Sequence, residues 1–288
     1  MNKYVKIIMI LFAIFSIAMN LHAASFYVDK DASGSNNGTS WTNAWESFSN
    51  INWDLVHAGD VIYISGGSFS KTYTETLTMY RWENGGASGT VSDRITICPG
   101  VSQGHNGTVI IEGDTSKENC IYIKEYDYIK INGLKIKGGN IRVRSATGVI
   151  VEDCNIDVKR AHGGVMVNGY GIPCRDCIVR NNRITNPVGA YPAQTDGIYS
   201  QMNINCIYEG NNILIRNEYS TQHTDGIQLY KDKGTIIRNN YIEHLVRGSV
   251  SPHSNGIMTS DCSGTLTLYN NVIYTPYFTG WGNTFIHI

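Results

Sequence analysis

Short apolar runs alternate with polar corners along most of the chain, and the corners repeat at a nearly constant interval. The clearest corner is a pair of asparagines, and successive pairs stand 30, 28 and 31 residues apart. Each pair lies between two runs rich in Ile, Val and Thr, which are too short and too interrupted to be helices. Such a period predicts stacked coils. The four copies are Arg180-Asn181-Asn182-Arg183-Ile184, Gly210-Asn211-Asn212-Ile213-Leu214, Arg238-Asn239-Asn240-Tyr241-Ile242 and Tyr269-Asn270-Asn271-Val272-Ile273.

A second repeat runs in phase with the first, with copies spaced by 29 and 30 residues. Asparagine suits a repeated corner because it tolerates the left-handed backbone region and its amide both donates and accepts hydrogen bonds. Two repeats of one period predict an all-β fold, a single-stranded right-handed parallel β-helix. The copies of the second repeat are Thr195-Asp196-Gly197-Ile198, Thr224-Asp225-Gly226-Ile227 and Ser254-Asn255-Gly256-Ile257.

The asparagine repeat weakens toward the N-terminus, where Cys154 and Asn132 are predicted to take the place of the second asparagine. The alignment is ambiguous by one residue around Asn211 and Asn270, because the loops differ in length. A slip of one residue would exchange the inward and outward faces of a strand.

The N-terminal residues predict an exported protein. Residues 1–23 combine two early lysines with an apolar run too short for a comfortable membrane span, which indicates a signal peptide; the alternative is an uncleaved anchor. Residues 24–57 are predicted to cap the stack, with a short helix starting at Ser40 or Thr42. Residues 58–288 are predicted to form the parallel β-helix. The last six residues resemble a strand with no cap after it, which predicts either a fragment of a longer protein or an end used for association.

Composition narrows the classes of partner and cofactor. The chain has 23 basic and 24 acidic residues and a net charge of −1, so no overall field favours nucleic acid or an anionic membrane. Seven cysteines are an odd number, so at least one thiol is free or pairs with another chain. Cys177 and Cys206 start equivalent strands and are interpreted as core residues, with a disulfide between them as the alternative. Cys174 and Cys177 form a C-x-x-C motif without the second pair that zinc needs.

These residues resemble the secreted bacterial proteins of the pectate-lyase-like right-handed β-helix superfamily. The resemblance is carried by Phe26-Tyr27-Val28-Asp29, the segment from Gly34 to Trp45, Ala58-Gly59-Asp60-Val61 and the asparagine coils. It implies a carbohydrate-active protein, since the superfamily includes pectate and alginate lyases and polygalacturonases. Gln194-Thr195-Asp196-Gly197 is similar to a polygalacturonase motif, but the Asp-Asp pair and the G-H-G and R-I-K motifs of those enzymes are missing. The resemblance therefore predicts the fold and leaves the activity open.

Asp196 and Asp225 are the leading candidates for catalysis. In one column their carboxylates would lie about 5 Å apart, so one would have a raised pKa or a Ca²⁺ ion would lie between them. His223 and His253 precede Asp225 and Asn255 by two residues and are candidate proton carriers. The alternative interpretation is structural, because Asp-Gly is also a common turn dipeptide.

The predicted substrate-binding residues follow on the same strands. If Ile198 and Ile227 point inward, alternation places Tyr199, Gln228 and Tyr230 outward. The tyrosines offer faces for sugar rings, and the nearby cations Lys231 and Arg247 are expected to meet a uronate carboxylate. The sequence thus predicts a protein that binds and cleaves an acidic polysaccharide by β-elimination or hydrolysis. A non-catalytic extracellular rod for adhesion or glycan binding is the alternative.

Overall fold

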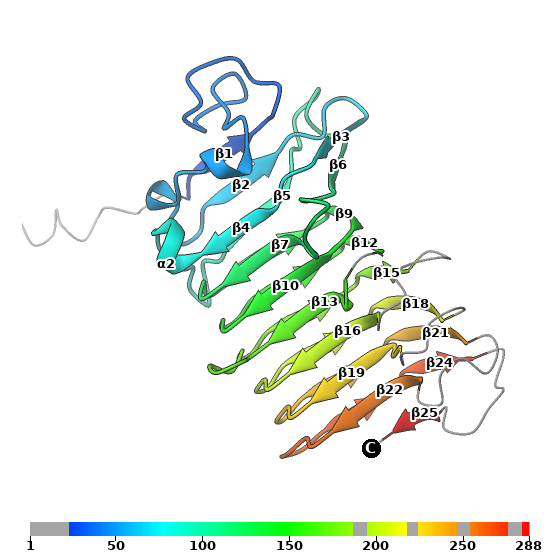
Figure 1. The fold of residues 1–288 in the computed structure, drawn as a ribbon. Coiled ribbons are helices and arrows are strands. Elements are labelled where there is room, and N and C mark those ends of the chain that lie inside the picture. The colour runs from blue at the N-terminus through cyan, green and yellow to red at the C-terminus, as the bar shows by residue number, and fades with distance from the viewer. Residues whose placement is uncertain are drawn as a thin grey trace, which may run out of the picture.

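The computed structural model describes residues 23–159, 161–186, 195–217, 224–246, 254–275 and 284–287. Over these residues the strands stack into three parallel sheets, which confirms the predicted right-handed parallel β-helix (Figure 1). Helical turns are few and short: η1 (Phe48–Asn50), η2 (Trp53–Leu55) and α2 (Arg81–Asn84). No helix among the described residues has the length and apolar character that a membrane crossing needs.

Each coil contributes one strand to each of the three sheets, and β1 adds a ninth strand to sheet A. Sheet A stacks β1 (Ser25–Val28), β2 (Val61–Ile64), β5 (Ile95–Pro99), β8 (Ile129–Asn132), β11 (Ile150–Glu152), β14 (Ile178–Arg180), β17 (Ile207–Glu209), β20 (Ile236–Arg238) and β23 (Thr267–Tyr269). Sheet B stacks β3 (Ser70–Tyr73), β6 (Thr108–Ile111), β9 (Lys135–Gly138), β12 (Asn155–Val158), β15 (Arg183–Thr185), β18 (Asn212–Asn217), β21 (Tyr241–Val246) and β24 (Val272–Tyr274). Sheet C stacks β4 (Leu77–Tyr80), β7 (Asn119–Lys124), β10 (Asn140–Arg144), β13 (Gly163–Asn168), β16 (Asp196–Gln201), β19 (Ile227–Tyr230), β22 (Asn255–Ser260) and β25 (Thr284–His287).

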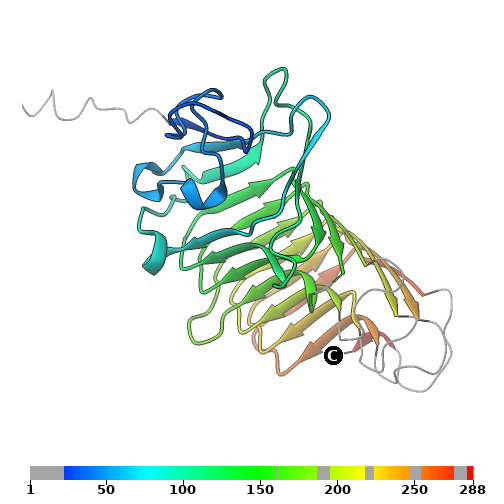
Figure 2. The ribbon, with the colours of Figure 1, turned by 45° about the horizontal axis from the view of Figure 1, so that its top comes forward.

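The core is a set of apolar columns inside the coils. Figure 2 shows the backbone of the same coils stacked one upon another. In sheet C, Ile198 pairs with Ile227, which pairs with Ile257, and all three side chains are buried. Because side chains alternate along a strand, the residues that directly follow these isoleucines face outward. The predicted inward and outward positions on β16 and β19 are therefore confirmed.

Asparagines form one column at the corner between sheets A and B, and its members Asn182, Asn211 and Asn240 are buried. Asn182 Nδ2 donates to Asn211 Oδ1 at 3.1 Å, Asn211 Nδ2 to Asn240 Oδ1 at 3.0 Å, and Asn240 Nδ2 to Asn271 Oδ1 at 2.9 Å. Each accepting Oδ1 also takes the backbone N–H of the asparagine in the preceding coil. The column therefore satisfies buried backbone groups that a turn would otherwise leave unpaired.

The ambiguity of one residue is resolved at Gly210. Gly210 adopts the left-handed conformation (φ 65°) that Asn181 and Asn239 adopt in their coils, with φ of 55° and 57°. Asn211 therefore takes the ladder position, and Asn212 is an exposed residue at the start of β18. The register was ambiguous in the sequence because the loops differ in length. In addition, glycine accepts a positive φ as asparagine does, so Gly210 could not be recognised as a corner residue.

Of the two predicted upstream members of the column, one is confirmed and one was wrong. The N–H of Cys154 donates to Asn182 Oδ1 at 3.0 Å, as expected for a residue one coil earlier. Asn132 instead ends β8 opposite Glu152, and its Nδ2 donates to Glu152 Oε1 at 3.1 Å. The apolar Leu134 has the place assigned to Asn132, because Asn155, the residue after Cys154, donates its N–H to the Leu134 carbonyl at 3.0 Å.

The segment predicted as a cap already contains the first strand of sheet A. β1 pairs with β2, so the sheet begins before residue 58. Trp45 is buried and stacks on Phe26 with ring centroids 5.2 Å apart. The helix expected at Ser40 or Thr42 is absent from this described segment; Ser40 Oγ instead accepts the Asn43 N–H at 3.2 Å in a turn. A capping role for residues 24–57 stays a prediction.

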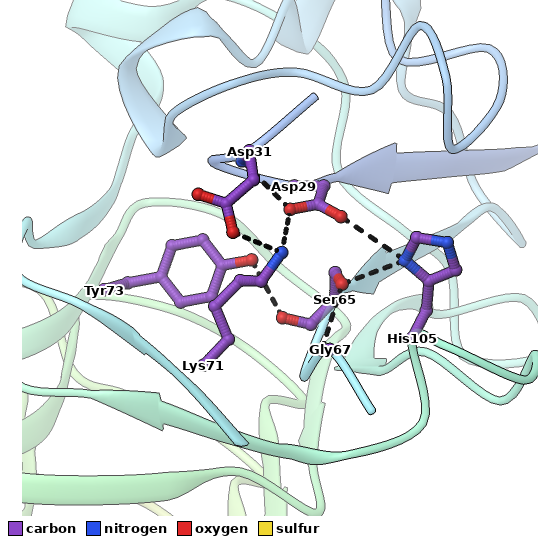
Figure 3. A network of polar contacts seen from close by, with 7 residues as sticks. All are labelled: Asp29, Asp31, Ser65, Gly67, Lys71, Tyr73 and His105. Carbon is purple, nitrogen blue, oxygen red and sulfur yellow. Dashed lines mark hydrogen bonds and ion pairs between the residues drawn. The ribbon is translucent and has the colours of Figure 1, made fainter. Parts of the chain in front are cut away.

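A polar network ties this N-terminal segment to the first coils (Figure 3). Lys71 Nζ contacts Asp29 and lies 2.9 Å from Asp31 Oδ2. His105 Nδ1 lies 3.3 Å from Asp29 Oδ2 and 2.9 Å from Ser65 Oγ. A Ser-His-Asp relay needs the hydroxyl and the carboxylate on opposite ring nitrogens, whereas here both meet Nδ1. The network therefore reads as a structural tie between β1, β3 and the loop after β5.

All seven cysteines are free thiols, so the alternative of a disulfide between Cys177 and Cys206 is not realised in the structure. Both side chains are buried in the core, as are those of Cys120, Cys154 and Cys174. Cys177 Sγ lies 3.5 Å from the Ala146 carbonyl oxygen of the preceding coil. These residues pack as small apolar groups.

Candidate functional site

The outward face of sheet C carries two continuous columns of side chains. Strand pairing places the first column on Thr78, Tyr122, Arg142, Met166, Tyr199, Gln228 and Met258. The second column, two residues further along each strand, consists of Tyr80, Lys124, Arg144, Asn168, Gln201, Tyr230 and Ser260. Four of these residues are tyrosines, three are cations and none is a carboxylate.

Sheet A differs from sheet C in how its charges are balanced. Its outward column alternates Glu152, Arg180, Glu209 and Arg238. Arg180 lies 2.5 Å from Glu152 and Arg238 lies 2.5 Å from Glu209, so these charges compensate one another. On sheet C, the Nε atoms of Arg142 and Arg144 are buried and meet no hydrogen-bond partner within the described residues. At Arg142 and Arg144, sheet C therefore offers positive charge, whereas Lys124 lies 3.9 Å from Glu125.

A pocket of about 270 Å³ opens in the middle of the sheet C face. His162, Met166, Asp196, Tyr199 and Gln228 line it. Gly163 stands opposite Asp196 in the preceding coil, and a Cβ there would approach the Tyr199 Cβ to 3.3 Å. The glycine thus helps keep the space beneath Tyr199 open.

His162 is the polar residue of this pocket that sequence reasoning missed. It directly precedes β13, and its Nδ1 lies 2.8 Å from Glu118 Oε1. Because the carboxylate fixes one ring nitrogen, the other is left to meet a ligand. The side chain is half exposed, at 52%. An imidazole oriented in this way is suited to accept a proton from a bound substrate.

Tyr199 stands beside His162 in the pocket and keeps its phenol proton. Burial raises the pKa of Tyr199, the charges of Asp196 and Tyr230 raise it further, and Arg142 opposes the shift. A phenol held in its neutral form can donate a hydrogen bond or a proton to a ligand oxygen. Arg142 is close enough to influence this group, so the pocket combines an acceptor, a donor and a nearby cation.

Asp196 and Asp225 form part of a buried hydrogen-bond ladder between coils. Asp196 Oδ1 accepts the Asp225 N–H at 2.8 Å, and Asp225 Oδ1 accepts Asn255 N at 2.7 Å and Asn255 Nδ2 at 3.0 Å. Both carboxyl side chains are fully buried, although Asp196 also borders the pocket. This placement agrees with the structural interpretation of the Asp-Gly repeat, and a catalytic role for either residue stays a prediction.

Glycine follows each aspartate of this ladder for a steric reason. A Cβ on Gly197 would lie 2.4 Å from Ile213 Cγ2, and one on Gly226 would lie 2.4 Å from Ile242 Cγ2. The isoleucines belong to sheet B, so the start of each sheet C strand runs directly against the opposite sheet. Close packing between sheets C and B therefore accounts for the glycine of the Asp-Gly-Ile repeat, in addition to turn chemistry.

The aspartate pair does not have the features expected of the proposed Ca²⁺ site. The described residues contain no group of three or more His, Cys, Asp or Glu side chains arranged to hold a metal ion. Both Oδ1 atoms are occupied by N–H donors. Burial raises the pKa of Asp225 to about 7, which favours its neutral form. A Ca²⁺ ion prefers charged, accessible oxygens.

The raised pKa predicts a pH-dependent effect of Asp225→Asn. An unfolded aspartate has a pKa of about 3.9, so folded Asp225 keeps its proton to higher pH, and its contribution to stability is present below about pH 4 and lost as the pH rises to about 7. The asparagine stays neutral. We expect the variant to gain on the order of 3 kcal/mol relative to wild type between pH 4 and pH 8. Thermal unfolding at both pH values, with exposed Asp261→Asn as the control, measures this; an equal difference at both pH values would contradict it.

The other predicted residues are only partly brought together. Gln228 and Tyr230 lie on the outward face of β19, as expected. Lys231 follows them in a left-handed turn, and its Nζ lies 4.9 Å from the Tyr230 ring centroid, away from the pocket lining. His223, His253 and Arg247 lie outside the described residues. Another histidine, His244, is buried in sheet B, and burial lowers its pKa to about 4.

Comparison with solved structures supports the fold. No family model and no curated protein matches the sequence. The chain is similar to an alginate lyase from Paenibacillus sp. str. FPU-7, with 17% identity over 84% of this chain and 97% of that chain and a TM-score of 0.50. It is also similar to pectate lyase Pel9A, with 14% identity over 89% of this chain and 80% of that chain and a TM-score of 0.51. At such identities the likeness shows the parallel β-helix fold alone.

Proposed function

We propose that the protein binds an acidic polysaccharide along the outward face of sheet C and cleaves it by β-elimination. The observation that carries the proposal is the composition of the two outward columns, which combine Lys124, Arg142 and Arg144 with tyrosines and contain no carboxylate. Cations attract the carboxylates of uronate units, and tyrosine rings offer faces and hydroxyls to sugars. The two lyase-like folds are consistent with this proposal.

The pocket supplies the groups that an elimination requires. His162 takes the proton on the carbon next to the uronate carboxylate, and Arg142 stabilises the negative charge that develops on that carboxylate. The electron pair of the broken C–H bond forms the new C=C bond as the glycosidic C–O bond breaks. Tyr199 donates its proton to the leaving oxygen. The products are a new chain end with a hydroxyl group and an unsaturated uronate.

Hydrolysis is less well supported by the same geometry. Glycoside hydrolysis generally uses two carboxyl groups on either side of the scissile bond. The predicted pair, Asp196 and Asp225, is buried and engaged by backbone N–H groups. Glu118 contacts His162 and so serves to orient the imidazole. The pocket therefore favours elimination, with Glu118 as a positioning residue.

A substrate panel tests the proposal. Pectate, alginate and glycosaminoglycans are incubated with the protein while unsaturated-product absorbance and reducing ends are followed together. We expect both signals to rise in parallel on at least one acidic polymer, whereas hydrolysis would raise reducing ends alone. Binding without products would support the non-catalytic alternative, and neither binding nor products on any polymer would overturn the proposal.

Arg142 gives a sharper test of how the acidic chain is recognised. Arg142→Gln removes a cation whose charge acts on Tyr199, and we expect binding of the preferred oligosaccharide to weaken about tenfold, or about 1.4 kcal/mol. Titration calorimetry measures the change. Arg183→Gln removes an exposed cation from β15 on sheet B and is the matched control. Equal losses in the two variants would indicate a general charge effect.

Export of the protein is also a proposal. Of the predicted signal peptide, residues 1–23, all but the last residue lie outside the described part of the chain. An extracellular, periplasmic or cell-surface location agrees with a polymeric substrate too large to cross a membrane. Detecting the protein in culture medium or periplasm, with a new N-terminus at Ala24 or Ser25, would support it; retention of the intact chain in the cytoplasm would contradict it.

A further inference from the structure

A second cavity, of about 560 Å³, lies at the carboxyl ends of the first sheet C strands. Its walls come from three separate coils. Arg81 and Trp82 belong to α2, which directly follows β4; Glu125 directly follows β7; and Ile172 lies in the loop after β13. The candidate pocket at His162 shares none of these lining residues. The cavity is therefore a distinct feature with no role in the elimination described above.

The cavity presents an aromatic face to solvent. The Trp82 side chain is 82% exposed and Ile172 is 60% exposed, which is unusual for two large apolar residues that line the same cavity. Arg81 and Glu125 place polar groups beside them. One oxygen of Glu125, Oε2, is buried and meets no hydrogen-bond partner in the described chain. A flat apolar surface edged by hydrogen-bonding groups suits a sugar ring, which has apolar faces and a polar rim.

The turn that carries Trp82 is held in place. Gly85 and Gly86 both adopt left-handed conformations, with φ of 70° and 76°. The Gly86 N–H donates to Asp54 Oδ1 at 2.9 Å, and the Tyr126 hydroxyl donates to the Gly85 carbonyl. A Cβ on Gly86 would lie 2.5 Å from the Trp53 carbonyl oxygen. Because the turn is already fixed, a ligand that stacks on Trp82 need not order it, which lowers the entropic cost of binding.

The cavity borders the second outward column of sheet C, because Glu125 directly follows Lys124 of that column. Glu125 Oε1 lies 3.9 Å from Lys124 Nζ, and that ammonium group lies 3.6 Å from the centre of the Tyr80 ring. Arg144 is the next residue of the column, and its guanidinium lies 5.9 Å from the ring centre of Tyr170. A line of cations and aromatic rings thus links the cavity to the strands that carry the His162 pocket.

We propose that the cavity at Trp82 is a remote subsite that stacks one sugar residue of the same acidic chain. This inference rests on the proposed function. β7 and β16 are three strand spacings apart, or about 14 Å, which is farther than a disaccharide spans. The subsite therefore makes the protein prefer long chains: an oligosaccharide that fills the His162 pocket reaches Trp82 only if it is several sugars long.

The test compares long and short oligosaccharides. Oligogalacturonates and oligoalginates of two and of eight units are titrated by calorimetry into wild type, Trp82→Ala and the control Phe69→Ala, which removes a ring that is 90% exposed before β3. We expect Trp82→Ala to weaken binding of the octamer about tenfold and to leave the dimer unchanged. Phe69→Ala should change neither. In parallel, the octamer should shield Trp82 fluorescence from acrylamide, as read from the difference between wild type and Trp82→Phe.

The outcomes separate this inference from the proposed function. If wild type binds the octamer but Trp82→Ala binds it equally well and quenching is unchanged, the subsite is overturned while the sheet C proposal stands. If Trp82→Ala weakens the dimer and the octamer alike, Trp82 does not form a remote subsite and the inference is also overturned. If wild type binds no oligosaccharide of either series and no polymer of the substrate panel, both proposals fail together.

Discussion

We expect His162→Gln to lower kcat by at least about 100-fold on the polymer that wild type cleaves, while KM changes little. Glutamine keeps a polar side chain of similar reach but cannot accept the proton that elimination must remove. Glu118 Oε1 lies 2.8 Å from His162 Nδ1, so the carboxylate orients the base and Glu118→Gln should have a smaller effect than His162→Gln. Initial rates from the absorbance of the unsaturated product provide the measurement.

Two controls distinguish a loss of catalysis from a loss of fold. His57→Gln changes an exposed histidine between η2 and β2 that does not line the His162 pocket, and it should retain the wild-type rate. Circular dichroism and thermal midpoints should be the same for all three variants, because the His162 side chain is half exposed. A His162→Gln variant that keeps more than half of the wild-type kcat would remove His162 from the mechanism.

The second large effect concerns stability. We expect Asn211→Ala to lower the free energy of unfolding by about 3–5 kcal/mol, since the buried Asn182 N–H loses its acceptor and the bonds to the Val179 carbonyl and Asn240 Oδ1 are lost. The loss is felt by the coils on both sides, because each ladder asparagine serves the coil before it and the coil after it. Urea unfolding followed by circular dichroism measures the change.

The neighbouring residue provides the control within the same asparagine pair. Asn212 is exposed at the start of β18, so Asn212→Ala should change stability by no more than about 0.5 kcal/mol. The two variants remove adjacent asparagines of the same corner, the buried Asn211 in one case and the exposed Asn212 in the other. Comparable losses from both would contradict the ladder register, and a larger loss from Asn212→Ala would reverse it.

The fold was predictable because its period appears in the sequence as a repeat of residue types that few other structures require. Paired asparagines recur where the backbone turns left-handed and where an amide serves two neighbouring coils, as at Asn182 and Asn240. The exact register was not predictable at Gly210, because glycine meets the same backbone requirement without resembling asparagine. Asn132 misled for the opposite reason: an asparagine on an outward strand position looks the same in sequence as one in the corner.

The candidate site was only partly predictable. Alternation correctly placed Tyr199, Gln228 and Tyr230 outward, since inward isoleucines fix the parity of their strands. The Asp-Gly repeat drew attention to Asp196 and Asp225, and their burial shows how a carboxylate can repeat for reasons of backbone hydrogen bonding. A repeated residue suits the requirements of the stack, whereas a pocket needs residues that differ from coil to coil.

Neither the repeats nor the alternation of side chains indicated that His162 belongs to the candidate site. It is not part of either repeat, and its partner Glu118 lies in the coil region more than forty positions earlier in the chain. Their meeting depends on how the segment before β7 folds over the start of β13, and loop length sets that geometry. The one available clue was the position of His162 directly before a sheet C strand, where the proposed polymer would pass.

Hydrogen-exchange mass spectrometry with a bound acidic octasaccharide tests the central claim most directly. The account predicts that ligand slows exchange in peptides covering residues 119–124, 140–144, 163–168 and 196–201 of sheet C and around Trp82, while the sheet A strands 178–180, 207–209 and 236–238 stay unchanged. Slowed exchange confined to sheet A or sheet B, with sheet C unaffected at saturating ligand, would contradict it.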